Sequence, residues 1–184
     1  MRLFVALDIP EELKHKVLEI QKRFDSEKLD IKFVEPENLH ITLKFLGEVH
    51  QKEIMNIEER IFKIVKEFSP FSINLHGVDY FGNKNYIRVL WINVKKGKEK
   101  LIEIINNLNQ QLNYIRKDEH RPNPHLTIGR VRSGKNRERL LRILESVKDM
   151  KIGEIIVNEI KLKQSILTPK GPIYKDIKTF SLVK

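Results

Sequence analysis

The sequence contains no cysteine among its 184 residues. This absence excludes a disulfide framework, a thiolate metal site and a cysteine nucleophile. No apolar run approaches the length of a membrane helix, and the N-terminus lacks the basic segment and apolar core of a secretory signal. The Gly-x-x-x-x-Gly-Lys loop that binds ATP phosphates is also missing. We therefore expect a cytoplasmic protein that does not contact a membrane.

The composition is that of a soluble globular protein, with 40% hydrophobic and 33% charged residues. A chain of this length fits one compact domain, 1–184, large enough to bury a core. Lys and Arg number 35 against 25 Asp and Glu, which gives a formal net charge of +10. This excess predicts an anionic partner such as a nucleic acid or a nucleotide.

One short pattern occurs twice, as His40-Ile41-Thr42-Leu43 and as His125-Leu126-Thr127-Ile128. Polar and apolar residues alternate in both copies, as they do in a half-buried β-strand whose successive side chains point to opposite faces. The His and Thr of each copy then share one face, with Cα atoms roughly 6.6 Å apart. A proline-bearing segment precedes each copy, at 35–38 and 121–124. The doubled pattern predicts a two-sided site for one small anion.

Apolar spacing along the rest of the chain predicts alternating strands and helices. The expected strands are 2–7, 31–34, the first motif strand to Leu46 with Gly47 ending it, two runs within 71–94, the second motif strand, one long strand at 152–166, and 173–183. The first expected helix begins at Asp8-Ile9-Pro10 and ends near residue 27, and three further helices carry apolar stripes that start with Ile54, Leu101 and Leu140. This order resembles a degenerate duplication and predicts an α+β fold built on antiparallel sheets.

The two His-x-Thr motifs resemble the signature of the 2H phosphoesterase superfamily. More narrowly, the chain resembles the RNA 2′,3′-cyclic phosphodiesterase family, also called the 2′-5′ RNA ligase family. The resemblance spans essentially the whole chain and is carried by residues 2–8, 39–47, 124–130, 171–174 and 180–182. It implies two pseudo-symmetric, intertwined lobes around a central cleft, each an antiparallel sheet with helices packed outside. It also implies a monomer without cofactor or metal that acts on RNA ends, including those of tRNA fragments.

Two imidazoles on either side of a phosphate suit acid–base cleavage, because a histidine with an ordinary pKa of about 6.5 can donate or accept a proton near neutrality. The hydroxyls of Thr42 and Thr127 can donate to the phosphate oxygens. The resemblance implies that a 2′,3′-cyclic phosphate opens to a 2′-phosphate, with His40 as proton donor and His125 as proton acceptor. Since the two motifs are nearly symmetric, the residues alone leave these roles open. The reverse reaction would join RNA through a 2′-5′ bond.

Four neighbours are candidate RNA contacts. Lys44 has the strand parity of His40 and Thr42, which predicts that it extends the phosphate-binding face. Arg130 has the opposite parity to His125 and points away from the phosphate unless a bulge at Gly129 reverses it. By the same parity argument Phe45 belongs to the core. The remaining two candidates, which would stack on a base, are Tyr174 and Phe81.

Two other functions compete with cyclic phosphodiester hydrolysis. A zinc site is the first, since His120 and His125 have a spacing compatible with paired ligands, although no His-Glu-x-x-His motif occurs. A non-catalytic basic RNA-binding module is the second, supported by the net charge and scattered aromatic residues. Loss of activity with chelator would indicate the metal site, and RNA binding without turnover would indicate the binding module.

Overall fold

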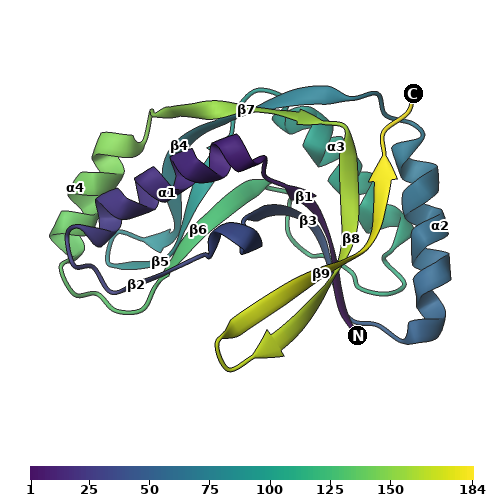
Figure 1. Cartoon of the computed structure of the whole chain (residues 1–184), viewed down its shortest axis with the longest axis horizontal. Helices are drawn as coiled ribbons and strands as arrows, with labels where there is room; N and C mark the ends of the chain where they lie inside the picture. Colours follow the sequence, from purple (N-terminus) through teal and green to yellow (C-terminus); the bar gives the residue numbers. More distant parts are fainter.

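The computed structural model describes all residues, 1–184, as four α-helices, two short 3-10 helices and a nine-stranded sheet (Figure 1). The strands are β1 (Arg2–Asp8), β2 (Ile31–Phe33), β3 (His40–Glu48), β4 (Phe71–Asn83), β5 (Tyr86–Val94), β6 (His125–Val131), β7 (Lys151–Val157), β8 (Glu159–Thr168) and β9 (Gly171–Ser181). The helices are α1 (Glu11–Asp25), η1 (Pro36–Asn38), η2 (Gln51–Glu53), α2 (Ile54–Val65), α3 (Lys98–Gln111) and α4 (Arg137–Val147).

All strands pair antiparallel in one curled sheet of order β7-β4-β5-β6-β3-β1-β8-β9, and β2 adds to β6. The two motif strands, β3 and β6, are neighbours at the middle of this order. They share a single recorded pair, Ile41 with Leu126, whereas every other neighbouring pair of main strands forms a longer ladder. The sheet therefore divides at the motif strands into a half with β7, β4, β5, β6 and β2 and a half with β3, β1, β8 and β9.

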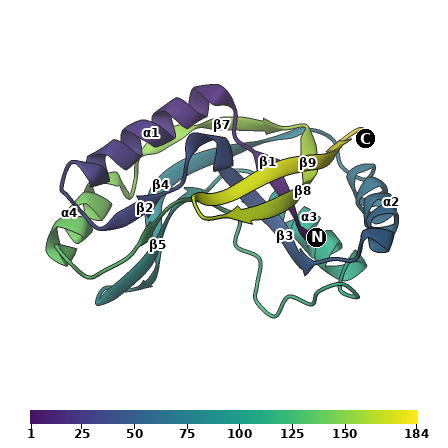
Figure 2. The ribbon, with the colours of Figure 1, turned by 60° about the horizontal axis from the view of Figure 1, so that its bottom comes forward.

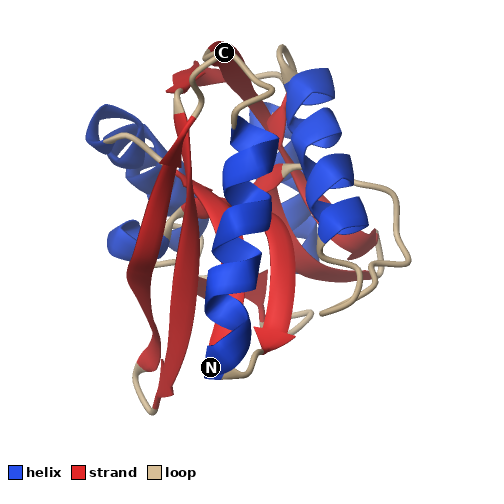
Figure 3. Cartoon of the chain, turned by 90° about the vertical axis from the view of Figure 1, so that its right-hand side faces the viewer, coloured by secondary structure: helices blue, strands red, loops and turns tan.

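Two helices cover each half on the outer side of the sheet. Helices α1 and α4 pack over β4, β6 and β7, while α2 and α3 contact each other and pack over β3 and β9 (Figures 1 and 3). The connections cross between halves, because α1 follows β1 yet packs on the other half, and α3 follows β5 yet packs on β3. The predicted α+β fold, built on antiparallel strands with helices packed outside, is confirmed.

The apolar residues of both motifs point toward the helices. Ile41, Leu43, Leu126 and Ile128 are at most 3% exposed and belong to a core cluster of 44 buried residues. Burying one such side chain contributes roughly 1.5–3 kcal/mol. This burial fixes which face of each motif strand turns inward, and so leaves the histidines and threonines on the opposite, concave face.

Two predicted strand boundaries are wrong. Gly47 does not end the first motif strand, since it adopts a φ of +75° inside β3 and still pairs with Leu3 next to a bulge. The predicted long strand 152–166 is two strands separated at Asn158, where the chain leaves β7 at one edge of the sheet and enters β8 in the other half. The alternation changes phase at this break, from Ile155 and Val157 to Ile160 and Leu162, which the predicted single strand did not take into account.

None of the helices is long and apolar enough to cross a membrane.

Candidate active site

The two motif histidines lie on the same concave face of neighbouring strands. In the antiparallel register set by Ile41 and Leu126, His40 is on the Thr127 side of the pair and Thr42 is on the His125 side. Both histidines and both threonines line one cleft of about 750 Å³. The structure thus brings together the four residues that the sequence predicted as a site.

A backbone carbonyl orients each imidazole in the same way. His40 Nδ1 lies 2.7 Å from the carbonyl oxygen of Asn38, and His125 Nδ1 lies 2.6 Å from that of Asn123. A carbonyl oxygen only accepts hydrogen bonds, so Nδ1 of each ring carries a proton and donates it. The neutral ring then has its lone pair on Nε2, which is the nitrogen left to exchange a proton with a substrate.

Two aromatic side chains pack against each imidazole. His40 has Phe4 and Tyr174 with ring centroids at 5.1 Å each. His125 has Phe81 at 4.9 Å and Trp91 at 5.5 Å, and these two aromatic rings stack on each other at 4.9 Å. Phe81 thus packs beside His125, and Tyr174 lines the cleft. The RNA contacts expected of Phe81 and Tyr174 stay predictions.

Burial lowers the pKa of both histidines below the ordinary value of 6.5. For His40 the Asn38 carbonyl and Asp8 oppose this, whereas Lys163 and the positive form of His125 add to it. For His125 the Asn123 carbonyl opposes the lowering of the pKa and Lys98 adds to it. Both free imidazoles are thus predominantly neutral at pH 7, and an anion bound between them would favour protonation of one.

A β-bulge follows the threonine in each motif. In β3, Thr42 pairs with Ala6 and Lys44 with Val5, so Leu43 has no partner on β1. In β6, Thr127 pairs with Trp91 and Gly129 with Leu90, so Ile128 is the extra residue. Each bulge reverses the alternation of side chains beyond it. The fourth residue after each motif histidine therefore faces inward and the fifth faces the cleft.

The bulges correct the parity argument for three residues. Phe45 and Arg130, at equivalent positions, both line the cleft, so assigning Phe45 to the core was wrong. The guanidinium carbons of Arg2 and Arg116 lie 5.1 and 4.8 Å from the centre of the Phe45 ring. Arg130 is exposed in the cleft, as expected if the strand contains a bulge.

Lys44 does not reach the cleft, so its predicted place on the phosphate-binding face is wrong. Its side chain is 0% exposed, and its Nζ donates to the carbonyl oxygen of Arg116 at 2.9 Å and to Asp118 Oδ2 at 2.6 Å. An unpaired buried charge would be costly. Lys44 instead anchors the loop between α3 and β6 beneath the sheet.

A ring of four charges beside His40 was not predicted from the sequence. Lys161 and Lys163 each bond to both Asp8 and Asp176, with four Nζ–Oδ distances from 2.7 to 2.9 Å. Burial raises the pKa of Asp8, but the hydrogen bonds from the two lysines bring it below its ordinary value. Sequence periodicity gave no sign of this ring, because its members come from three strands.

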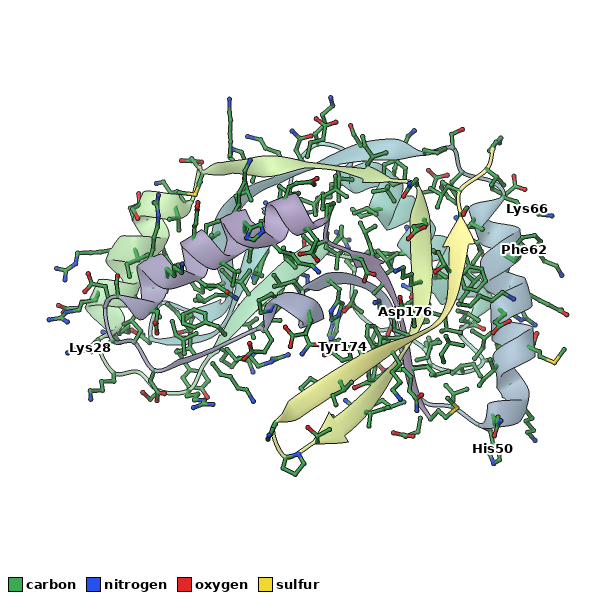
Figure 4. The ribbon with its side chains drawn as sticks, in the orientation of Figure 1. Lys28, His50, Phe62, Lys66, Tyr174 and Asp176 are labelled. Carbon is green, nitrogen blue, oxygen red and sulfur yellow. The ribbon has the colours of Figure 1, made fainter.

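The ring of four charges joins the strands whose side chains pack against His40. Asp8 pairs across β1 and β3 with His40 itself, and Lys163 pairs with Phe4, whose ring contacts the imidazole. Asp176 lies on β9 two residues from Tyr174, the other aromatic neighbour (Figure 4). The corresponding neighbour of His125 is the neutral Asn93, which accepts a hydrogen bond from Lys98 at 3.4 Å.

The residues considered for a zinc site are not assembled into one. His120 is exposed in the loop before β6, and no group of three or more His, Asp or Glu side chains that could hold a metal ion is present.

The chain matches the family "LigT like Phosphoesterase" twice, over residues 7–91 and 92–174. Each match contains one His-x-Thr motif, in agreement with the predicted duplication. A relative from Archaeoglobus fulgidus named RNA 2′,3′-cyclic phosphodiesterase is 44% identical over 182 residues, which cover 98% of this chain and 99% of the relative. A relative of the same name from Methanocaldococcus jannaschii is 43% identical over 182 residues, which cover 97% and 99%. The crystal structure of TT0787 from Thermus thermophilus superposes with a TM-score of 0.84 at 28% identity, covering 99% of this chain and 98% of that one.

Proposed function

Because the chain belongs to the LigT-like phosphoesterase family, we propose that it hydrolyses RNA 2′,3′-cyclic phosphate ends to 2′-phosphate ends by acid–base catalysis without a metal. One observation carries this proposal. The two imidazoles are each held at Nδ1 by a backbone carbonyl, and both line one cleft, so that Nε2 is the nitrogen of each ring that can exchange a proton with a substrate. The names of the curated relatives support the choice of substrate.

The base step uses the neutral form of one imidazole. His125 Nε2 takes a proton from a water molecule, and the hydroxide oxygen forms a bond to phosphorus. The lowered pKa of His125 keeps its ring ready to accept that proton at neutral pH. The hydrogen bond from Nδ1–H to the Asn123 carbonyl stabilises the imidazolium that results.

The acid step uses the protonated form of the other imidazole. The bond from phosphorus to ribose O3′ breaks, and His40 Nε2–H gives its proton to the departing oxygen, which leaves the phosphate on O2′. Because burial lowers the pKa of His40, this proton must be retained with the help of the bound phosphate anion. Running the two steps backwards exchanges the roles and would join RNA ends through a 2′-5′ bond.

The threonines act on the non-bridging phosphate oxygens, where negative charge develops. Thr42 Oγ1 lies 3.0 Å from His40 Nε2, so this hydroxyl lies beside the nitrogen of the proposed acid. Thr127 Oγ1 has no hydrogen-bond partner in the structure and is free to donate to a substrate oxygen.

The test is hydrolysis of an RNA oligonucleotide that ends in a 2′,3′-cyclic phosphate, in the presence of EDTA, with identification of the product phosphate. We expect the wild type to form a 2′-phosphate and His40→Ala and His125→Ala each to lose about 10²–10⁴-fold in rate. His120→Ala, which removes an exposed loop histidine, is the matched control and should retain full activity.

Three outcomes would contradict the proposal. Activity that requires added metal would exclude the metal-free mechanism. RNA binding without turnover by the wild type would indicate a binding module. Unchanged turnover in either motif variant would show that the histidines are not the catalytic pair.

A further inference from the structure

The outer part of the β8–β9 hairpin leaves the sheet. The pairing of β8 with β1 ends at Gln164, whereas its pairing with β9 continues to the turn at Thr168 and Gly171. The hairpin consequently projects from the body as a two-stranded arm (Figures 1 and 2). Most of its residues between Ser165 and Tyr174 line one side of the cleft that contains the motif histidines.

The arm exposes apolar side chains on this side of the cleft. Leu167 is 67% exposed and lines the cleft together with Pro172. Leu167 pairs directly with Pro172, so the two side chains lie on one face of the arm, whereas Ile173, the next residue on β9, points to the opposite face. We call the pair the hairpin ledge (Leu167 and Pro172). Exposed apolar clusters beside a polar site commonly bind a ligand.

The ledge is fixed relative to His40. Asn38 Nδ2 donates to the carbonyl oxygen of Pro172 at 3.1 Å, and the Asn38 carbonyl oxygen accepts the hydrogen bond from His40 Nδ1. Tyr174, at the foot of the arm, contacts the His40 ring. Pro172 is two residues outward on β9, which is roughly 6.6 Å at the usual strand rise. The ledge thus lies two residues of β9 farther from the reacting phosphate than Tyr174 does.

Charged residues around the ledge favour a polyanion. Lys170 is exposed at the tip of the arm, and Lys32, Arg130 and Arg2 line the same cleft. Glu35 and Glu37 are the acidic residues of that lining. A surface with apolar contacts at its centre and cations nearby suits a nucleic-acid strand, whose bases have apolar faces and whose backbone is anionic.

We infer that the hairpin ledge binds the base of the nucleotide on the 5′ side of the one that bears the cyclic phosphate. This inference rests on the proposed function and extends it to specificity, since the enzyme would prefer RNA ends of two or more nucleotides over a free mononucleotide. The contact is made through the face of the base, so it is insensitive to base identity. Aliphatic groups give less contact than an aromatic platform, so the preference is modest.

The experiment compares kcat/KM for a nucleoside 2′,3′-cyclic phosphate with that for a dinucleotide that ends in the same group. The wild type should prefer the dinucleotide, and the double variant Leu167→Ser/Pro172→Ser should reduce that preference about fivefold. Leu167→Trp, which enlarges the stacking surface, should increase it. A dinucleotide without the 5′ base should be hydrolysed with the same kcat/KM by the wild type and the double variant.

Ile156→Ser is the matched control, because Ile156 is 60% exposed on β7 at the other edge of the sheet and does not line the cleft. It should leave the preference unchanged, and thermal melting verifies that all variants fold. Equal losses on mononucleotide and dinucleotide in the double variant would overturn the inference and leave the proposed function intact. Failure of the wild type to hydrolyse either substrate would instead overturn the proposed function.

Discussion

The two halves of the molecule position their motif histidines in the same way but place different charges next to them. Each half contributes a His-x-Thr strand, a carbonyl that fixes Nδ1, a bulge after the threonine and two aromatic rings against the imidazole. The charges next to the rings are not equivalent. His40 lies beside Asp8 within a ring of four charges, and His125 lies beside Asn93 and under the influence of Lys98.

This difference matters because acid–base catalysis needs two unlike groups. A symmetric pair of neutral imidazoles would have no preferred donor. The carboxylate of Asp8 favours the protonated form of His40, whereas Lys98 disfavours that of His125. Lys163 opposes Asp8 at His40, so the asymmetry depends on the balance within the charge ring. Four predictions test how far the two halves differ.

The largest effect is expected when either histidine is removed and the residual activity is followed against pH. His40→Ala should lose the alkaline limb of the kcat/KM profile, because that limb reports deprotonation of the acid. His125→Ala should lose the acidic limb, which reports protonation of the base. Both variants should be about 10²–10⁴-fold slower than the wild type. The reverse pattern of limbs would show that the roles are exchanged.

The next effect compares the two threonines. Thr42→Val and Thr127→Val keep the β-branched shape but remove the hydroxyl, and loss of one such donor costs up to about 10²–10³-fold in kcat. We expect the larger loss for Thr42→Val, because only Thr42 also contacts a histidine, His40. Steady-state kinetics of both variants measures the difference. Equal losses would mean that the contact between Thr42 and His40 has no catalytic consequence.

A smaller effect concerns the charge next to each imidazole. Asp8→Asn removes the carboxylate that raises the pKa of His40 and leaves Lys163 with less compensation, so the alkaline limb should move to lower pH. Asn93→Asp places a carboxylate beside His125, and the acidic limb should move to higher pH.

The charged groups that shift the pKa of His40 are Asp8, Lys163 and His125, and Lys98 lowers the pKa of His125. Asp176→Asn is the control for the charge ring, since it removes a ring carboxylate that does not pair with His40. It should move the alkaline limb less than Asp8→Asn does. If both ring variants move it equally, the net charge of the ring determines the pKa and the position of Asp8 does not.

The smallest effect compares Arg130 with Phe45, the fifth residues after the two histidines. Arg130→Gln should weaken binding of an RNA oligonucleotide that ends in a 2′-phosphate and should reduce the slope of log Kd against log salt by about 0.7, the value for one contact to a single strand. Phe45→Leu should leave the slope unchanged, because it removes no charge. A slope that does not change in Arg130→Gln would place this guanidinium away from the RNA phosphates.

The strands, the helices and the four motif residues were predictable because they depend on local spacing. Alternation at His40 to Leu43 and at His125 to Ile128 assigned each side chain to a face, and the buried apolar residues confirm that assignment. The prediction failed just beyond the first motif. A bulge is a property of the pairing between two strands, so parity counted along one strand put Lys44 in the cleft and Phe45 in the core.

The sequence by itself determined the fold class and the paired His-x-Thr motifs, since periodicity and motif spacing are contained in the chain. Only the tertiary structure determined which side chains lie next to one another around the cleft. The charge ring draws Asp8, Lys161, Lys163 and Asp176 from three strands, and the hairpin ledge meets the motif only because Asn38 bonds to Pro172. Such contacts join residues distant in sequence, and their geometry follows from strand order, bulges and sheet curvature.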